Sequence, residues 1–365
     1  MINLRSPYYI TITNTNLTQA DLELYVYIGT QTTDRGTAKY TIQTPSINAV
    51  SVFEISELVR DYLEYTFNGT YNGVNVWVDY RIKEYISGVA GSYGSYVQLL
   101  GFDGYGYFEE GVNPQTTSQK LISNSTVFVL KNSPIRIPIK RDGLSFVKLF
   151  EYNQIEQINY SPSLESDEQI VYLLIDTKTE SFKARVLADS GIFEAEQCLI
   201  DYLGTYNDIS EALDMNINDS EIISIRQISE CKFTPYKVTF VNKFGALQDL
   251  YFFKKSVLNV TTKDEKYKSN IINNGTYSIS EHQNKILNKQ ASQKLTLNSG
   301  FYPEDYNEVF EQMLFSELVW IEMDGNTLPI NINTSSFTYK TQLNDKLIQY
   351  TIDVDFAHDK INNIR

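Results

Sequence analysis

The chain has 365 residues, more than one hydrophobic core usually covers, so two or three domains are expected. Hydrophobic residues make up 42% of it and charged residues 21%, which favours folded domains over a disordered chain. The formal net charge of −14 opposes direct nucleic-acid binding, because such proteins need a basic surface to neutralise phosphates.

The N-terminus lacks the charged and then apolar layout of a signal peptide, and no apolar run approaches the roughly eighteen residues of a membrane span. We therefore expect synthesis in the cytoplasm and no membrane insertion. The chain contains 27 Tyr and 19 Phe, which favour strands because aromatic side chains fit a pleated, half-buried surface. An AT-rich coding sequence is the alternative explanation for part of this excess.

Residues 1–140 are predicted to form an N-terminal β-sandwich-like domain with one inserted helix. Three strands are expected, Tyr9–Thr13, Leu22–Ile28 and Val74–Ile82, and apolar residues alternate in the last two. Ser56 is expected to be the N-cap of the helix, whose apolar face carries Leu58, Val59, Tyr62 and Leu63.

A run rich in Gly and Tyr extends from Ser87 to Gly111. Its candidate interface residues are Tyr93, Tyr96, Tyr105, Tyr107 and Phe108. One interpretation is an aromatic loop that stacks on a partner protein or on sugar rings. The other is a tight turn assembly in which Gly supplies positive φ and Tyr caps a core. The nearest candidates for a glycosidase carboxylate pair also lie in this run: Asp103, Glu109 and Glu110.

Residues 141–235 are predicted to form a middle β domain, entered through an extended segment between Pro134 and Pro138. Strands are expected at residues 146–150, 170–175, 182–187 and 222–228. Residues 192–203 are ambiguous, because their apolar pattern matches neither period clearly.

Residues 236–365 are predicted to form a C-terminal β domain. Its first strands are expected at residues 238–241, 250–253 and 295–297, and the polar stretch 261–275 is expected to be a loop or a mobile hairpin tip. An amphipathic helix is predicted over 303–317, with Pro303 in its first turn and a buried stripe formed by Tyr306, Val309, Phe310, Met313 and Leu314. Four strands are expected after the helix, at residues 319–321, 328–332, 337–343 and 348–356.

The predicted fold class is therefore mainly β with a minor α component. It comprises two or three β-sandwich- or barrel-like domains, with a short helix in the first and an amphipathic helix in the last.

Few residues of the sequence are candidates for catalysis or metal binding. His282 and His358 lie in unlike contexts, and we expect His358, beside Asp355 and Asp359, to be a solvated histidine at a strand end. The patterns of serine hydrolases, zinc proteases and P-loop nucleotide-binding proteins are absent. Cys198 and Cys231 are expected to be free thiols. We predict no enzymatic activity, no catalytic residue, no cofactor and no metal site.

Several segments follow one another along the chain: LRSPYYI, VTFVNKFGALQDLYFFKKS, LTLNSGFYPEDYNEVFEQMLFSELVWIEMDG, LPINI and TYKTQLNDKLIQYTIDVDFAHD. In these segments and their order the chain resembles virion structural proteins of tailed phages that infect Bacteroidetes-type bacteria, including crAss-like phages. The resemblance implies a tail, baseplate or neck component in the virion that contacts other virion proteins and forms a homo-oligomeric ring. Those proteins carry a stretch similar to FDGYGYFEEG, which supports a structural or interface role for it. The alternative function is a receptor-binding or carbohydrate-active β-protein on the same particle.

Overall fold

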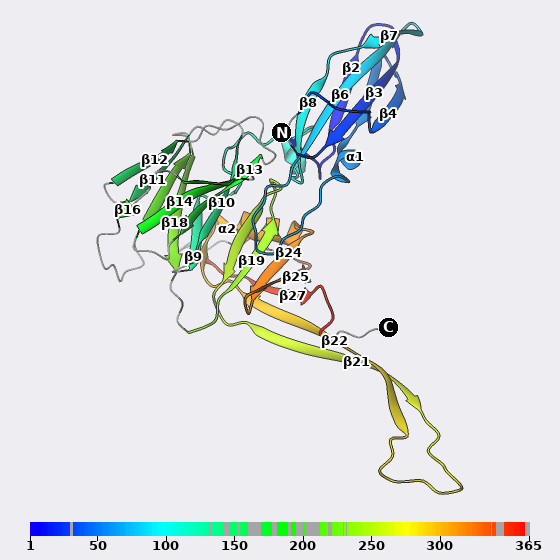
Figure 1. The fold of residues 1–365 in the computed structure, drawn as a ribbon, viewed down its shortest axis with the longest axis vertical. Coiled ribbons are helices and arrows are strands. Elements are labelled where there is room, and N and C mark those ends of the chain that lie inside the picture. The colour runs from blue at the N-terminus through cyan, green and yellow to red at the C-terminus, as the bar shows by residue number, and fades with distance from the viewer. Residues whose placement is uncertain are drawn as a thin grey trace. The chain divides into compact units, whose positions relative to one another are not determined.

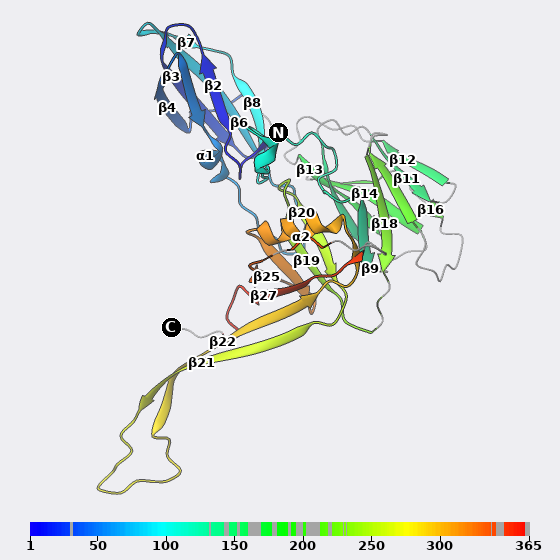
Figure 2. The ribbon, with the colours of Figure 1, turned by 180° about the vertical axis from the view of Figure 1, so that it is seen from behind.

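The computed structural model describes residues 1–29, 32–130, 133–141, 146–151, 154–159, 169–176, 181–188, 191–194, 200–201, 212–217, 221–228, 230, 232–336, 338–340 and 347–361. The protein is mainly β, as predicted, and its α-helices in these residues are α1 (Ser56–Arg60) and α2 (Tyr306–Phe315). Figure 1 and Figure 2 show the strands from two opposite sides.

The chain divides into two compact units. Unit 1 comprises Met1–Ser229, Thr239–Tyr251 and Glu308–Ser316. Unit 2 comprises Glu230–Val238, Phe252–Asn307 and Glu317–Arg365. The three-domain division with boundaries at 140 and 235 remains a prediction.

The N-terminal part of unit 1 is a β-sandwich. One sheet has the order β1-β8-β6-β3-β4, with β7 paired to β6, and a second sheet consists of β2 and β5. The strands are β1 (Ile2–Asn3), β2 (Tyr9–Thr13), β3 (Leu17–Tyr27), β4 (Tyr40–Pro45), β5 (Val50–Glu54), β6 (Val76–Ile86), β7 (Val89–Tyr93) and β8 (Val97–Phe102). Their core includes Leu22, Leu24, Phe53 and Val76, so alternation places one face of β3 and of β6 inside.

Helix α1 follows β5 directly and closes this sandwich. The sequence predicted Ser56 as its N-cap, but the N-cap is Ile55. Ser56 is the first helical residue because Glu54 accepts hydrogen bonds from its backbone N and its Oγ, so the acidic side chain caps the helix instead. Val59 of α1 is fully buried, whereas Tyr62 and Leu63 lie beyond the helix and are half-buried.

Two further sheets of unit 1 have the orders β10-β13-β14-β15, with β16 paired to β14, and β12-β11-β17-β18-β9. Their strands are β9 (Thr126–Leu130), β10 (Ile135–Lys140), β11 (Phe146–Glu151), β12 (Gln154–Asn159), β13 (Ile170–Asp176), β14 (Ser181–Ala188), β15 (Gly191–Glu194), β16 (Ile200–Asp201), β17 (Ala212–Ile217) and β18 (Glu221–Ile228). The four middle strands predicted from the sequence are confirmed. The extended segment between Pro134 and Pro138 is part of β10, and β9 and β10 pair with strands that follow residue 140. Cys198 and Cys231 lie outside the described residues.

The main sheet of unit 2 has the order β24-β25-β27-β22-β21, and β23 pairs with β26. The strands are β21 (Val257–Lys268), β22 (Asn284–Asn298), β23 (Tyr302–Pro303), β24 (Val319–Met323), β25 (Asn326–Ile332), β26 (Leu347–Ile348) and β27 (Thr351–Phe356). Two earlier strands pair with each other, β19 (Tyr236–Val241) and β20 (Leu247–Phe252). Asp324 and Gly325 both have positive φ, which matches the tight turn that a β24–β25 hairpin requires.

Helix α2 is shorter than the predicted span of 303–317. Tyr302 and Pro303 form β23 instead, because Tyr302 is fully buried with its ring 4.4 Å from that of Tyr306 and 5.5 Å from that of Phe253. Proline's fixed φ suits a short edge strand as well as a first helical turn. The buried stripe is confirmed for Tyr306, Val309, Phe310 and Met313, whereas Leu314 is half-buried.

Residues 261–275 are not all loop. Strand β21 continues to Lys268 and pairs with β22 along a long hairpin, of which the predicted strand 295–297 is only the last part. The predicted final strand is interrupted at Gln349 and Tyr350. Within the predicted strand 337–343, residues 338–340 form no strand and the others lie outside the described residues.

Candidate functional site

The structure divides the five candidate residues of the Gly- and Tyr-rich run between two places in unit 1. Tyr93 and Tyr96 lie on the sandwich sheet, at the end of β7 and just before β8. The other three follow β8, around the short 3₁₀ helix η1 (Phe108–Glu110). The run is therefore not a single loop, because strands β7 and β8 occupy much of it.

Tyr93 and Tyr96 cover an arginine on the polar face of the sandwich sheet. The Arg81 guanidinium carbon lies 4.5 Å from the Tyr93 ring centroid and 5.1 Å from that of Tyr96. The ring of Tyr96 also lies 5.4 Å from that of Tyr25, edge to face, and it is 39% exposed. These cation–π and aromatic contacts hold both rings against the sheet.

Charged residues alternate beneath these rings. Asp21 and Glu23 of β3 stand directly opposite Lys83 and Arg81 of β6 in the strand register, and the ion pairs measure 3.0 Å and 2.6 Å. Such opposite-charge pairs stabilise a sheet face. Burial opposes ionisation of Asp21 and Glu23, but hydrogen bonds from these and other neighbours outweigh it and lower the pKa of each carboxyl. Asp79, also on β6, pairs with Arg35.

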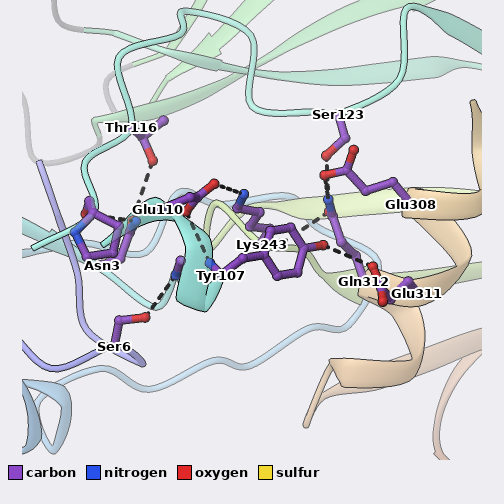
Figure 3. Close-up of polar contacts among 12 residues, drawn as sticks. Asn3, Ser6, Tyr107, Glu110, Thr116, Ser123, Lys243, Glu308, Glu311 and Gln312 are labelled. Atoms are coloured by element: carbon purple, nitrogen blue, oxygen red, sulfur yellow. Dashed lines mark hydrogen bonds and ion pairs between the residues drawn. The ribbon is translucent and has the colours of Figure 1, made fainter. Parts of the chain in front are cut away.

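Tyr105 and Tyr107 are anchored within their own chain. The Arg5 guanidinium lies 5.0 Å from the Tyr105 ring centroid, and the Tyr105 ring also contacts those of Tyr107 and Phe315, edge to face, at 5.9 and 6.3 Å. The Tyr107 hydroxyl donates to Glu311 Oε2 at 3.2 Å (Figure 3). Burial raises the pKa of both phenols, so both stay protonated near neutral pH.

Lys243 connects this anchor to η1. Its ammonium lies 4.1 Å from the Tyr107 ring centroid and forms an ion pair with Glu110. Glu110 also accepts a hydrogen bond from the Tyr107 backbone N at 3.1 Å, which completes a capping box at the start of η1 (Figure 3). The segment before η1 is thus fixed by both side-chain and backbone contacts.

Glycines in this segment allow a close backbone approach. A Cβ added to Gly104 would lie 2.8 Å from both Asn3 Oδ1 and the Lys243 carbonyl oxygen, and one added to Gly106 would overlap the Pro114 ring. The Gly106 backbone N donates to Ser6 Oγ at 2.8 Å. Gly104 and Gly106 thus serve intrachain packing by allowing this close approach, whereas Gly88 and Gly111 of the same run have positive φ, as the second interpretation predicts.

Phe108 differs from the four tyrosines. Its side chain is 97% exposed, and Val112, four residues later, is 77% exposed. Phe108 is therefore an aromatic ring in water on a segment that is held by Lys243, Glu110 and Ser6.

The three candidate carboxylates for a glycosidase pair, Asp103, Glu109 and Glu110, lie in different environments. Asp103 is buried and accepts a 2.8 Å hydrogen bond from Arg60 Nε, and Glu110 pairs with Lys243. Glu109 is exposed. The two paired carboxylates therefore contribute to the packing of unit 1.

The remaining candidates for a catalytic or metal-binding role are the two histidines and the aspartates of β27. His282 and His358 are exposed, and the His358 ring contacts Phe356 edge to face at 5.9 Å, just beyond the end of β27. Asp353 and Asp355 alternate with buried residues on β27 and are hydrogen-bonded to Thr296 and Asn333. No group of three or more potential metal ligands occurs among the described residues.

Gln312 is the polar centre of helix α2 and was not predicted from the sequence. It is fully buried, its Nε2 donates to Ser123 and to Glu308, and its Oε1 accepts from the Lys243 backbone N (Figure 3). The detectable signal was a glutamine beside Phe310 and Met313 on a stripe that is otherwise apolar.

No protein-family model matches the sequence, and no curated protein shows significant similarity to it. In the residues that the structure describes, no helix is both long and apolar enough to cross a membrane.

Proposed function

We propose that the chain is a structural component of a tailed-phage virion, in the tail, baseplate or neck, and that it works by binding other virion proteins in a symmetric assembly. The observation that carries the proposal is Phe108, a 97% exposed aromatic side chain on an anchored segment. Buried aromatic anchors dominate the energetics of protein interfaces, and a preorganised anchor loses little entropy on binding.

The pairing of charged groups supports a binding role over catalysis. On the sheet face, Arg81 and Lys83 neutralise the nearest carboxylates, and around η1 Lys243 neutralises Glu110. A general acid, base or nucleophile needs a group that is free to exchange a proton or attack a substrate. The resemblance in the quoted segments, which include the run around Phe108, supports the same proposal.

Tyr96 favours the alternative function. Its ring is 39% exposed and contacts Arg81 and Arg35, and the Arg35 guanidinium lies 4.2 Å from the ring centroid. An immobilised aromatic ring at a surface is suitable for stacking on a sugar. This supports a receptor-binding or carbohydrate-active protein on the same particle.

The experiment compares Phe108→Ser with Ile47→Ser in particle assembly. Ile47 is a matched control because it is a large apolar residue on the same unit, 74% exposed. We expect both variants to fold, Phe108→Ser to be incorporated into particles at a strongly reduced level, and Ile47→Ser to be incorporated normally. A particle map in which Phe108 still faces solvent would refute the proposal. Binding in a glycan array that is abolished by Tyr96→Ala would instead support the alternative.

A further inference from the structure

Unit 2 carries a long two-stranded hairpin, residues 257–298, which we call the arm. It consists of β21, β22 and the tip between them, and it extends away from the rest of unit 2 (Figure 1 and Figure 2). Strand β22 pairs with β27 over Lys294–Asn298, and among the described residues the outer part of the arm has no third strand. A two-stranded ribbon is only marginally stable in water by itself.

The arm exposes apolar residues along its length. All twelve residues of β21 are exposed. Exposed large apolar side chains on the arm are Val257, Leu258, Val260, Tyr267, Ile272, Tyr277, Ile279, Ile286 and Leu287. Ile279 is 97% and Leu287 71% exposed, and Leu287 lies at a β-bulge between paired residues of the two strands. A concentration of this kind marks a surface that a protein partner covers.

The outer edge of β21 is also open. In the described part of the chain, β21 is the last strand of its sheet and pairs only with β22. An open edge presents unpaired backbone N–H and C=O groups, to which a strand of another chain can be added.

The charge of the arm selects the partner. Residues 257–298 contain six lysines and three acidic residues, which gives the arm a formal charge of +3. The whole chain has a formal net charge of −14, so the residues outside the arm carry −17. Among the described residues, Lys263, Lys268 and Lys285 have no ion-pair partner, unlike Lys289 and Lys294. The arm is thus a basic and apolar projection from a strongly acidic protein, and it is complementary in charge to the body of an identical chain.

We propose that the arm binds the acidic body of a second copy of this chain. The contact is heterologous, because the arm of one copy meets a different surface of the next, and such contacts build rings or filaments. This inference rests on the symmetric assembly in the proposed function and names the segment and the partner that form it.

The first test is the self-association of the purified chain in sedimentation velocity. We expect association that strengthens with protein concentration and weakens with salt, since exposed charges are screened. In a shortened variant, Asn-Gly replaces residues 264–289, so that a two-residue turn joins the paired positions Lys263 and Gln290. We expect this variant to keep the circular dichroism spectrum expected for the remaining strands and to lose self-association.

A charge-reversal pair tests complementarity without shortening the chain. Lys263→Glu with Lys268→Glu reverses two exposed lysines of the arm, and Lys39→Glu with Lys232→Glu reverses two exposed lysines outside the arm. Both double variants change the net charge by the same amount. We expect roughly tenfold weaker self-association for the arm variant and little change for the control.

Zero-length carbodiimide cross-linking of mixed unlabelled and 15N-labelled copies identifies the contact. We expect lysines of the arm joined to carboxylates outside the arm in peptides that combine one labelled and one unlabelled chain. A monomeric wild type at every concentration, normal association of the shortened variant, or cross-links confined to one chain would each overturn the inference. If the protein is found in particles but one of these results is obtained, only the role of the arm fails. If the arm mediates self-association but the protein is absent from particles, only the proposed function fails.

Discussion

Replacing Phe310 with alanine should destabilise the protein by about 4 kcal/mol. Phe310 lies in the middle of helix α2 and is fully buried. Removing the ring from a buried site loses about 2–3 kcal/mol of transfer free energy. A residual cavity of roughly 80 Å3 would add about 2 kcal/mol at 24 cal/mol per Å3. The neighbouring Met313 side chain is flexible enough to fill part of the cavity, which places the expected value near the middle of the usual range of about 3–5 kcal/mol.

Urea unfolding followed by tryptophan fluorescence measures this loss. Trp77 reports on unit 1 and Trp320 on unit 2, so each signal is recorded in a variant where the other tryptophan is replaced by phenylalanine. Separate signals are needed because a chain with two units need not unfold in one transition. Phe108→Ala is the matched control, since it removes the same ring from an exposed position and should change stability by less than about 0.5 kcal/mol. A loss below about 1 kcal/mol for Phe310→Ala, with an unchanged m-value, would refute the assigned burial.

The other predictions concern the anchor around η1, the sheet face and helix α2. Gly106→Ala should lower stability by about 1–3 kcal/mol in the same urea assay, because its Cβ would overlap the Pro114 ring, whereas Gly36→Ala, which meets no atom, tests the positive-φ cost alone. Gln312→Ala should cost about 1–3 kcal/mol, because it leaves the part-buried Lys243 backbone N without an acceptor. Gln312→Met, which keeps the volume but removes the acceptor, should cost a similar amount, and unchanged stability of this variant would contradict the reason. Asp21 and Glu23 have folded-state pKa values below their unfolded values, so their stabilisation is present above about pH 4 and is lost as the pH falls through the lower folded-state values. Thermal melting from pH 7 to pH 3 should show a drop in Tm that is smaller for the Asp21→Asn, Glu23→Gln double variant, and an identical drop would contradict the assignment.

Elements with a clear apolar period could be predicted from the sequence. Alternation located β6 and β27 to within a few residues, β2 and β24 matched predicted strands without that signal, and the spacing of Val309, Phe310 and Met313 located the buried face of α2. The start of α2 could not be read in the same way, because Pro303 is compatible with a first helical turn and with an edge strand. What decided between them was the contact of Tyr302 with Phe253, 49 positions earlier in the chain.

The outer part of β21 was predicted as a loop or a mobile hairpin tip because this strand has no buried face. The alternation that identifies a strand depends on one face lying in a core, and all of β21 is exposed. The sequence from Lys263 to Lys268 therefore looked like a polar loop, although it pairs residue by residue with β22. Only the Asn-Gly pair at 274–275, which has positive φ at both positions, gave a local indication of a hairpin tip.

The run Ser87–Gly111 is rich in Gly and Tyr, a composition typical of protein interfaces, but most of its tyrosines are used in packing within the chain. Tyr107 reaches Glu311, 204 positions away, and Tyr105 lies between Arg5 and Phe315. Such contacts cannot be inferred from local spacing. Replacing Tyr105 and Tyr107 together with serine would therefore damage unit 1 itself, so impaired assembly of that variant would not identify an interface. Phe108 separates the two effects, because the tyrosines and Glu110 hold its segment while its own ring contributes almost nothing to the fold. The tyrosines orient the segment, and Phe108 is the part of it whose ring stays in solvent.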